Sequence, residues 1–331
     1  MSCLVAFSAV AAPLDAFNFV EIERARILDK AGRYLDEKPV TVTAESCPRS
    51  AGGIHDFYSE GDYWWPDPKN PDGPYIRRDG MSNPNNFVAH RLAMIRLSEI
   101  TATMASAYII TGDEKYAAHA VEHLRAWFVT PETHMAPHLL YAQAIKGKTT
   151  GRKVGIIDTI HLVEVARAAK VLESSQSFSK HDADSVKKWF KQYLRWLNTH
   201  PQGQQERDAT NNHGTCWVMQ VAAFAQFVGD DAQMEWCRDR YKKVLLPNQM
   251  AADGSFPLEL RRTKPYGYSL FNIDAFAGVC QILSTPEDNL WEYTTEDGRG
   301  MRKGMEFIFP YIADKSIWPY KPDVLYYDKW P

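Results

Sequence analysis

The sequence has few cysteines, little net charge and no long apolar run. Its formal net charge is −3, which argues against a dedicated nucleic-acid binder, because such proteins are usually basic. No segment is apolar and long enough to predict a membrane span. The five cysteines are scattered and none forms a Cys-x-x-Cys pair, which argues against a zinc ribbon or dithiol motif and favours free, buried thiols: Cys3, Cys47, Cys216, Cys237 and Cys280.

The composition is otherwise that of a soluble globular protein. The chain has 331 residues, of which 45% are hydrophobic and 24% are charged. This length permits one large domain or two small ones. A polyanionic ligand is compatible with the small net charge, because a basic cleft can form locally.

The N-terminal segment from residue 3 to 12 is apolar and ends in small residues, which is typical of a secretory signal. No lysine or arginine precedes it, and an apolar N-terminal helical turn is the alternative interpretation. We favour the signal, so that residues 1–14 are a signal-peptide remnant, residues 15–331 are a single domain, and the protein is periplasmic or secreted.

Most of the chain follows the apolar spacing of helices. Helices are predicted at 15–37, 90–111, 113–128, 156–174, 182–198, 211–228, 231–246, 269–284 and 299–308, with few strand signals. Short Gly-Asp turns follow two of them, at Gly112-Asp113 and Gly229-Asp230. The predicted fold class is therefore all-α. Helix pairs of this kind stack into a solenoid or close into an α/α toroid.

Long loops separate these helices, at 39–90, 129–153, 199–210 and 255–268. The run from Asp62 to Tyr75 holds four prolines and cannot be a regular element. A loop of this length inside a compact domain is usually functional. Its aromatic residues suit sugar stacking, although Trp64 and Trp65 could equally pin the loop to the core. In an α/α toroid these loops would gather at the mouth of one cleft.

Two short runs combine the side chains of one reaction class. The first is Asn211-Asn212-His213 at a predicted helix start, and the second contains Arg262 and Tyr268. Removing a proton α to a carboxylate requires a guanidinium and an amide to take up the spreading charge. A His or Tyr must move the protons. The two runs supply all of these groups and indicate an elimination in which the β-oxygen leaves.

On these residues the chain resembles the alginate-lyase superfamily of polysaccharide lyases, which are α/α toroids. Asn211-Asn212-His213 matches the Asn-Asn-His motif of these enzymes, and the run from Glu259 to Tyr268 resembles their Glu-Leu-x-Arg…Tyr motif. Asn70-Pro71-Asp72-Gly73 and the run from Tyr141 to Ile145 resemble further loop segments. The likeness covers about residues 55 to 285.

One segment departs from the best-known alginate lyases of this type. After Arg261 the chain reads Arg-Thr-Lys-Pro-Tyr-Gly-Tyr-Ser, which shortens the spacing between the arginine and the tyrosine. This variant is more similar to subfamilies that include both alginate and glucuronan enzymes. Tyr266 and Tyr268 are therefore both candidates for the catalytic phenol.

The resemblance implies four catalytic residues: Asn212, His213, Arg262 and Tyr268. Arg262 would bind the substrate carboxylate in a bidentate contact, which lysine cannot make. Asn212 would be a second carboxylate ligand. His213 would be a neutral general base, because a helix N-terminus disfavours the charged imidazole. Tyr268 would be the catalytic acid, with Arg262 or Lys264 as the cation that a tyrosine base requires.

Further residues are candidates for substrate binding, but a purely structural role would explain each of them at least as well. They are Asn211, Tyr266, Trp64, Trp65, His90, His138, Tyr141, Gln143 and Arg261. Arg261 and Arg262 are adjacent and point apart, so one could face the cleft while the other pairs with an acid such as Glu259.

Two histidine pairs have the spacing of metal ligands, His119/His123 on a predicted amphipathic helix and His134/His138 in a loop. We expect the first pair to be solvated, and the second has no Glu or Cys in register. The sequence therefore predicts neither a metal nor a cofactor.

The sequence predicts a lyase that cleaves a β-1,4-linked polyuronate by β-elimination, with poly-mannuronate favoured and glucuronan second. In both sugars the C5 hydrogen and the C4 oxygen lie on the same side, so one tyrosine could move both protons. In guluronate they lie on opposite sides, so His213 would be the base and Tyr268 the acid. The partner would be the anionic polysaccharide, with neither nucleic acid nor membrane, and the protein a monomer or homodimer.

Two other functions fit a toroid of this kind. A glycoside hydrolase would need two opposed carboxylic acids. Candidates are present, but none sits in a persuasive pair: Asp62, Asp67, Asp158, Asp208, Glu259 and Asp274. A glycan-binding protein without activity is the third reading, against which the complete set of four catalytic residue types argues.

Overall fold

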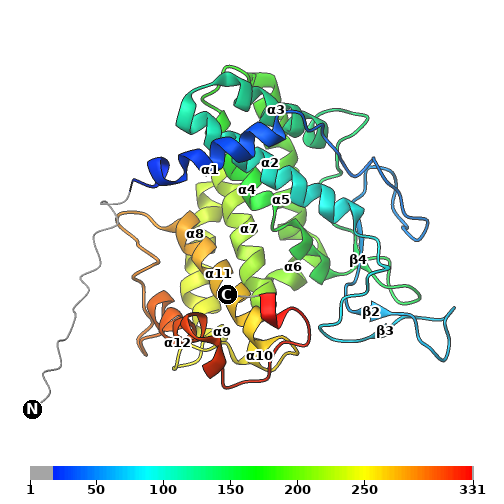
Figure 1. Ribbon diagram of the computed structural model, residues 1–331, viewed down its shortest axis with the longest axis vertical. Coiled ribbons are helices and arrows are strands. Elements are labelled where there is room, and N and C mark those ends of the chain that lie inside the picture. Colours follow the sequence, from blue (N-terminus) through cyan, green and yellow to red (C-terminus); the bar gives the residue numbers. More distant parts are fainter. Residues whose placement is uncertain (1–17, 330–331) are drawn as a thin grey trace, which may run out of the picture.

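Helices make up most of the molecule, as the apolar spacing predicts (Figure 1). The computed structural model describes residues 18–329, so the expected signal segment, residues 1–14, lies outside the described residues. The longer helices are α1 (Phe19–Tyr34), α2 (Ala89–Thr111), α3 (Glu114–Phe128), α4 (Leu162–Leu172), α5 (Lys180–Thr199), α7 (Asn212–Val228), α8 (Asp231–Arg240), α11 (Pro265–Leu283) and α12 (Met301–Ala313).

Four helices form a continuous inner row, in which α2 packs against α4, α4 against α7, and α7 against α11. An outer layer covers this row: α1 and α3 pack on α2, α5 and α8 on α7, and α12 on α11. The inner helices α7 and α11 bury residues on nearly every side, whereas α3 and α5 bury one face, as expected of inner and outer positions. The all-α fold class and the α/α toroid are confirmed.

The two predicted Gly-Asp turns connect inner helices to outer ones. Gly112 ends α2 with φ 68°, and Gly229 ends α7 with φ 75°, a left-handed conformation that glycine adopts without a steric penalty. The following aspartates cap the next helices, because Asp113 accepts from the Lys115 N–H and Asp230 accepts from the Gln233 N–H. The sequence therefore specifies these two corners locally.

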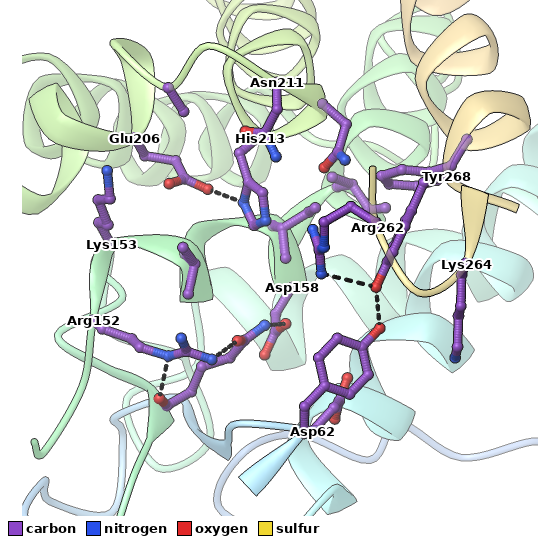
Figure 2. A pocket seen from close by; sticks show the side chains of 18 of the residues that line it. Asp62, Arg152, Lys153, Asp158, Glu206, Asn211, His213, Arg262, Lys264 and Tyr268 are labelled. Atoms are coloured by element: carbon purple, nitrogen blue, oxygen red, sulfur yellow. Dashed lines mark hydrogen bonds and ion pairs between the residues drawn. The ribbon is translucent and has the colours of Figure 1, made fainter. Parts of the chain in front are cut away.

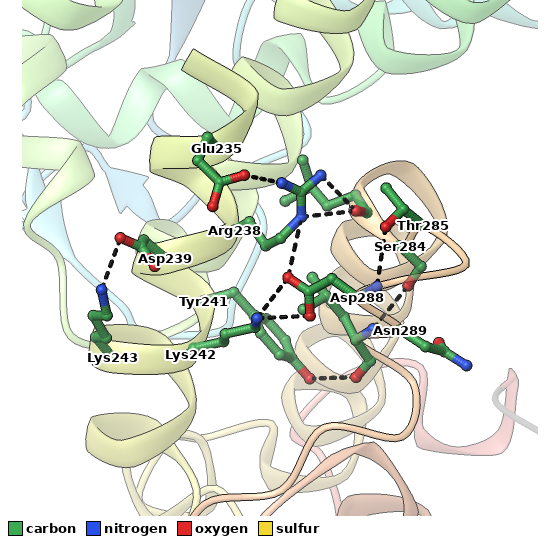
Figure 3. Close-up of polar contacts among 12 residues, drawn as sticks. Glu235, Arg238, Asp239, Tyr241, Lys242, Lys243, Ser284, Thr285, Asp288 and Asn289 are labelled. Carbon is green, nitrogen blue, oxygen red and sulfur yellow. Dashed lines mark hydrogen bonds and ion pairs between the residues drawn. The ribbon is translucent and has the colours of Figure 1, made fainter. Parts of the chain in front are cut away.

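A cluster of charged contacts ties α8 to the end of α11 (Figure 3). Lys242 donates to Asp288 at 2.6 Å, and the Arg238 guanidinium donates to the Leu283 carbonyl at 3.0 and 3.1 Å. Tyr241, in the π-helix η3 (Tyr241–Leu245), donates to the Leu290 carbonyl at 3.4 Å. The Arg238 contacts satisfy the Leu283 carbonyl at the C-terminus of α11, which has no partner within the helix.

Several helix boundaries differ from the prediction: the helix expected at 156–174 is a 3-10 helix followed by α4, and the one expected at 299–308 extends to Ala313. Two further differences shape the cavity described below. The segment 199–210, expected to be a loop, contains α6 (Pro201–Arg207), and the helix expected from residue 269 begins at Pro265 as α11. Both helices carry proline at their first position, where its fixed φ and missing N–H cost nothing. The proline signal outweighs the polar composition that suggested loops. As a result, Tyr266 and Tyr268 lie in the first turn of a helix.

The remaining helical segments are short. They are the 3-10 helix η2 (Lys153–Thr159), α9 (Leu246–Gln249), α10 (Pro257–Leu260), and the 3-10 helices η4 (Lys315–Ile317) and η5 (Tyr327–Lys329). Within residues 18–329 no helix combines the length and apolarity that a membrane crossing requires.

Two small sheets lie inside the segments expected to be irregular. β1 (Tyr58–Glu60) pairs in parallel with β4 (Tyr141–Ala144), which joins the first long loop to the second. β2 (Trp64–Trp65) pairs antiparallel with β3 (Ile76–Arg77). The four prolines of this run all fall between β2 and β3, where no strand needs their missing N–H groups. Figure 1 shows this hairpin projecting from the helical body below β4.

Four cysteines and one of the two histidine pairs are buried. Cys47, Cys216, Cys237 and Cys280 are free and buried, as predicted for the described part of the chain. The expectation that His119 and His123 are solvated is wrong: they are 8% and 2% exposed, with ring centroids 4.9 Å apart. The His123 ring donates to the Glu37 carbonyl at 3.2 Å, because the segment after α1 folds over this face of α3.

Candidate active site

A cavity of about 610 Å³ opens where the N-terminal turns of α7 and α11 meet η2 and the segment around β2. Its volume is within the range of small-molecule and cofactor sites. Six of its charged side chains are basic and three are acidic, so the cavity is positive although the whole chain carries −3. They are Arg77, Arg91, Arg152, Lys153, Arg262 and Lys264, with Asp62, Asp158 and Glu206.

His213 lies on this cavity at the start of α7, and Glu206 of α6 holds it (Figure 2). The Glu206 carboxylate is 1% exposed and accepts from Nδ1 of His213. This contact places the ring proton on Nδ1 and leaves the lone pair of Nε2 for proton transfer. Sequence reasoning missed Glu206, because the polar segment that carries it predicts a loop, whereas the structure has α6 there.

Asn212 is held by a second buried carboxylate, that of Glu259. The Asn212 main-chain N–H donates to Oε1 at 2.8 Å and its side-chain amide donates to Oε2 at 2.7 Å. Burial raises the pKa of Glu259, while the Asn212 bonds and the charge of Arg262 oppose this shift. The suggestion that Glu259 pairs with an arginine is thus wrong. Its partner is the amide that precedes His213.

The close approach of this motif to the preceding loop depends on Gly214. A Cβ at this position would lie 2.2 Å from the Ala209 carbonyl oxygen, a distance that backbone atoms cannot tolerate. Asn211 is the N-cap residue of α7 by position and lines the cavity, but its side chain makes no capping bond. Glu259 instead accepts from the first N–H of the helix.

Arg262 and Tyr268 also meet at the cavity (Figure 2). The Arg262 guanidinium donates to the Tyr268 phenol oxygen at 3.3 Å and to Asp79 at 3.1 and 3.3 Å. Burial opposes ionisation of Asp79, but its hydrogen bond and ion pair with Arg262 hold its pKa below the usual value. Asp79 therefore orients the guanidinium, and the sequence carried no signal for this role.

Tyr63 completes this cluster and was also missed. Its phenol oxygen is 2.5 Å from that of Tyr268. Burial raises the pKa of Tyr268, the Tyr63 phenol raises it further, and Arg262 only partly offsets the shift. The Tyr268 phenol is therefore neutral at neutral pH and is ready to donate a proton. The only signal for Tyr63 was its place in the aromatic loop.

A chain of polar contacts forms the floor of the cavity (Figure 2). Asp158 accepts from Gln143 at 3.0 Å and from Arg91 at 3.3 Å, and Gln143 in turn accepts from Arg152 at 2.7 Å. Gln143 has φ 49°, a left-handed backbone that is uncommon for a residue other than glycine. Such strain is retained where the surrounding contacts hold it, which supports a role in the site.

The remaining sequence candidates divide between the cavity and its surroundings. Trp64 and Gln143 line the cavity. The other six do not: Trp65, His90, His138, Tyr141, Arg261 and Tyr266. The Tyr266 phenol donates to the Tyr311 carbonyl at 3.2 Å, away from the cavity, and Arg261 is exposed. Of the two candidate phenols, only Tyr268 reaches the site.

Two of these outlying side chains have clear structural partners. Nδ1 of His90 accepts from the Tyr58 N–H at 2.9 Å, which anchors β1 to α2. His138 lies 3.2 Å from the Asp56 carboxylate. Both contacts organise the long loops around the cavity.

The alginate lyase family profile matches residues 41–318, which is most of the chain. This chain belongs to the alginate lyase family. The crystal structure of an alginate lyase from Bacteroides ovatus is 36% identical, with a TM-score of 0.86, and the match covers 92% of this chain and 81% of that chain. Membership of the alginate lyase family makes the chain a polysaccharide lyase and sets aside the glycoside hydrolase alternative.

More distant alginate lyase structures share the fold. An alginate lyase from Sphingomonas species A1 is 17% identical with a TM-score of 0.55, covering 90% of this chain and 78% of that chain. A variant of that enzyme complexed with a tetrasaccharide is 16% identical with a TM-score of 0.57, covering 90% and 77%. Comparison with curated proteins gave no significant match.

The carboxylates of the cavity agree with a lyase rather than a hydrolase. Asp62 accepts from Arg91 at 2.8 Å, Asp158 accepts from Arg91, Gln143 and Ser59, and Glu206 accepts from His213. Each carboxylate is thus engaged by a neighbouring donor. None is left as an opposed acid and base across the cavity.

Proposed function

We propose that the chain cleaves a β-1,4-linked polyuronate by β-elimination, with poly-mannuronate of alginate as the favoured substrate. The observation that carries the proposal is the contact between Arg262 and Tyr268, 3.3 Å apart, in a positive cavity that also presents His213. It combines a binder for the carboxylate with a neutral proton donor and an imidazole base. These are the three groups that the elimination requires.

The first step is recognition of the uronate carboxylate. The Arg262 guanidinium, fixed by Asp79, offers donors to the carboxylate and stabilises the negative charge that moves onto its oxygens when the C5 proton leaves. The Asn212 amide, fixed by Glu259, provides a second polar contact at the cavity. Held in this way, both groups need little reorganisation during the reaction.

The second step is proton transfer. The C5–H bond breaks and its electron pair forms the C4–C5 double bond, while the C4–O bond breaks and its oxygen takes a proton. The high pKa of Tyr268 supports this phenol as the proton donor to the leaving oxygen. In mannuronate, where both groups lie on the same side, the Tyr268 oxygen would accept the C5 proton as it gives its own proton to the leaving oxygen, and it would end as a neutral phenol. In guluronate the lone pair of His213 would accept it.

Glucuronan is the second candidate substrate. Glucuronate shares with mannuronate the same-side arrangement of the C5 hydrogen and the C4 oxygen, so the same residues would act. The similarity of the run from Arg262 to Ser269 to subfamilies with both activities supports testing both polymers. The apolar segment at residues 3–12 supports action in the periplasm or outside the cell.

The test is the ultraviolet absorbance of new unsaturated uronate ends on poly-mannuronate, poly-guluronate and glucuronan. Wild type is compared with Tyr268→Phe and with Tyr266→Phe as the matched control, because the Tyr266 phenol points away from the cavity. We expect a rise with wild type and Tyr266→Phe that disappears with Tyr268→Phe.

Two outcomes would change the proposal. A rise that persists in Tyr268→Phe would keep the elimination and move the proton donor to Tyr63 or His213. No rise on any of the three polymers, with folded protein, would reject the polyuronate proposal.

A further inference from the structure

A set of exposed cations lies beside the cavity, each held over an aromatic ring. The Lys148 ammonium lies 5.5 Å from the ring centroid of Trp64, and the Lys146 ammonium lies 5.7 Å from that of Tyr75. The Arg78 guanidinium lies 5.1 Å from that of Trp65. We call Arg78, Lys146 and Lys148, with their three rings, the basic strip.

The basic strip is built from two segments that are distant in sequence. The rings and Arg78 belong to the β2–β3 hairpin, and the lysines belong to the turn after β4. The Tyr75 N–H donates to the Lys146 carbonyl at 3.0 Å, which joins them. Gly147 has φ 74°, and a Cβ there would lie 2.8 Å from the Pro74 backbone. This glycine therefore permits both the turn and its close packing on the hairpin.

The strip continues directly from the cavity. Trp64 and Arg77 belong to the same hairpin and line the cavity wall, and Lys148 lies over the Trp64 ring. Arg77 is already paired with Asp79 at 2.5 Å. In contrast, no ion pair forms within residues 18–329 at Arg78, Lys146 or Lys148, although all three are exposed. The hairpin's Asp67 and Asp72 lie in the turn between its strands.

The contact between each cation and its ring contributes little free energy at an exposed site. At an exposed site it is worth roughly 0.5–1 kcal/mol, so each head group stays hydrated and accessible to an anion. The ring does hold the long side chain in place, which lowers the entropy lost when an anion binds. A row of positioned cations beside apolar rings suits a ligand that repeats a carboxylate on every sugar.

We propose that the basic strip binds uronate residues of the polymer outside the cavity, so that it determines affinity for long substrates. This inference rests on the proposed function, since it assigns outer sugar-binding positions to the same site. It predicts that the contribution of the strip grows with chain length and is weakened by salt, because the contacts are exposed.

The experiment compares Lys146→Glu/Lys148→Glu with a matched control, Lys188→Glu/Lys191→Glu, which reverses two exposed lysines of α5. Steady-state kinetics on poly-mannuronate and on its trisaccharide separate outer from inner contacts. We expect the KM for the polymer to rise roughly tenfold, as for two lost surface contacts, with a smaller change for the trisaccharide. Salt at about 1 M should remove most of the difference.

Several results would overturn the proposal. They are an unchanged KM for the polymer, an equal loss on polymer and trisaccharide, or an equal loss in the control. Circular dichroism verifies folding, and Lys146→Gln/Lys148→Gln, which removes charge without reversing it, replaces the first variant if that one unfolds.

A binding measurement separates this proposal from the proposed function. If wild type cleaves no polyuronate, the polyuronate proposal fails, but retention of poly-mannuronate in affinity electrophoresis still tests the strip. Weaker retention of the double variant than of the control would support the strip. Equal retention, or binding of single-stranded DNA as tight as that of poly-mannuronate, would reject a uronate-binding strip.

Discussion

The phenol oxygens of Tyr63 and Tyr268 lie 2.5 Å apart, although 205 positions separate the two residues. Because the Tyr63 phenol contributes to the raised pKa of Tyr268, the pair should titrate differently when one member is removed. Tyr63, which directly precedes β2, thus influences the pKa of Tyr268 in α11.

Replacing Tyr63 with Phe should lower kcat roughly fivefold, the effect of losing one hydrogen bond of about 1 kcal/mol. It should also lower the pKa of Tyr268, since it removes a contact that raises this pKa, and so move the pH–rate profile to lower pH. Initial rates between neutral and alkaline pH measure both effects. A profile that stays in place or moves to higher pH would show that the two phenols are not coupled.

The Arg262→Lys variant should lose on the order of 10²-fold in kcat/KM, because an ammonium cannot replace the fork that contacts Asp79 and Tyr268. Arg261→Lys is the matched control, since Arg261 is adjacent, exposed and outside the cavity. Steady-state rates of both variants make the comparison. Equal losses in the two would contradict the assignment of Arg262.

The tail residue Asp323 should matter for activity although it lies outside the cavity. Its carboxylate accepts from the Tyr266 N–H at 3.0 Å and the Gly267 N–H at 2.9 Å, and so caps α11 where the N-cap residue Lys264 cannot. Asp323→Ala should destabilise the fold by about 1–2 kcal/mol. It should also lower kcat, because the two N–H groups that Asp323 binds directly precede Tyr268.

Asp328→Ala, an exposed position on the same tail, is the control for Asp323→Ala. Thermal unfolding and kcat of both variants provide the readouts. If Asp323→Ala matched the control in both, the tail would have no part in positioning Tyr268.

Stability should fall between about pH 6.5 and pH 4 because of His123. Burial lowers its pKa from 6.5 to about 4, and the nearby His119 adds to the shift. The folded state then binds fewer protons than the unfolded state in this window, so stability decreases as the pH falls through it, by about 3 kcal/mol at most. Denaturant unfolding as a function of pH measures this slope.

His123→Gln should make the slope shallower, and His181→Gln, at an exposed position, should leave it as in wild type. Identical slopes in wild type and His123→Gln would assign the effect to other buried groups.

Much of the fold follows from local sequence. Helical spacing predicts the long helices, and Gly112-Asp113 and Gly229-Asp230 end one helix and cap the next through their own backbone and side chain. The helix starts at Pro201 and Pro265 differ from the prediction, because proline at the first helical position favours a helix where the polar composition favours a loop. Motif residues such as Asn212, His213, Arg262 and Tyr268 could be selected because their types and spacing carry the chemistry.

The sequence alone thus determined the helices, the family motifs and the four candidate catalytic residues. Tertiary structure decided the choice of Tyr268 over Tyr266, because two residues apart on a helix point to different sides, one to the cavity and one to Tyr311. It also supplied Glu206, Glu259, Asp79 and Tyr63, which hold the motif residues in place. All four lie on a different segment of the chain from their partner, so only the packing of separate helices and loops brings the pairs together.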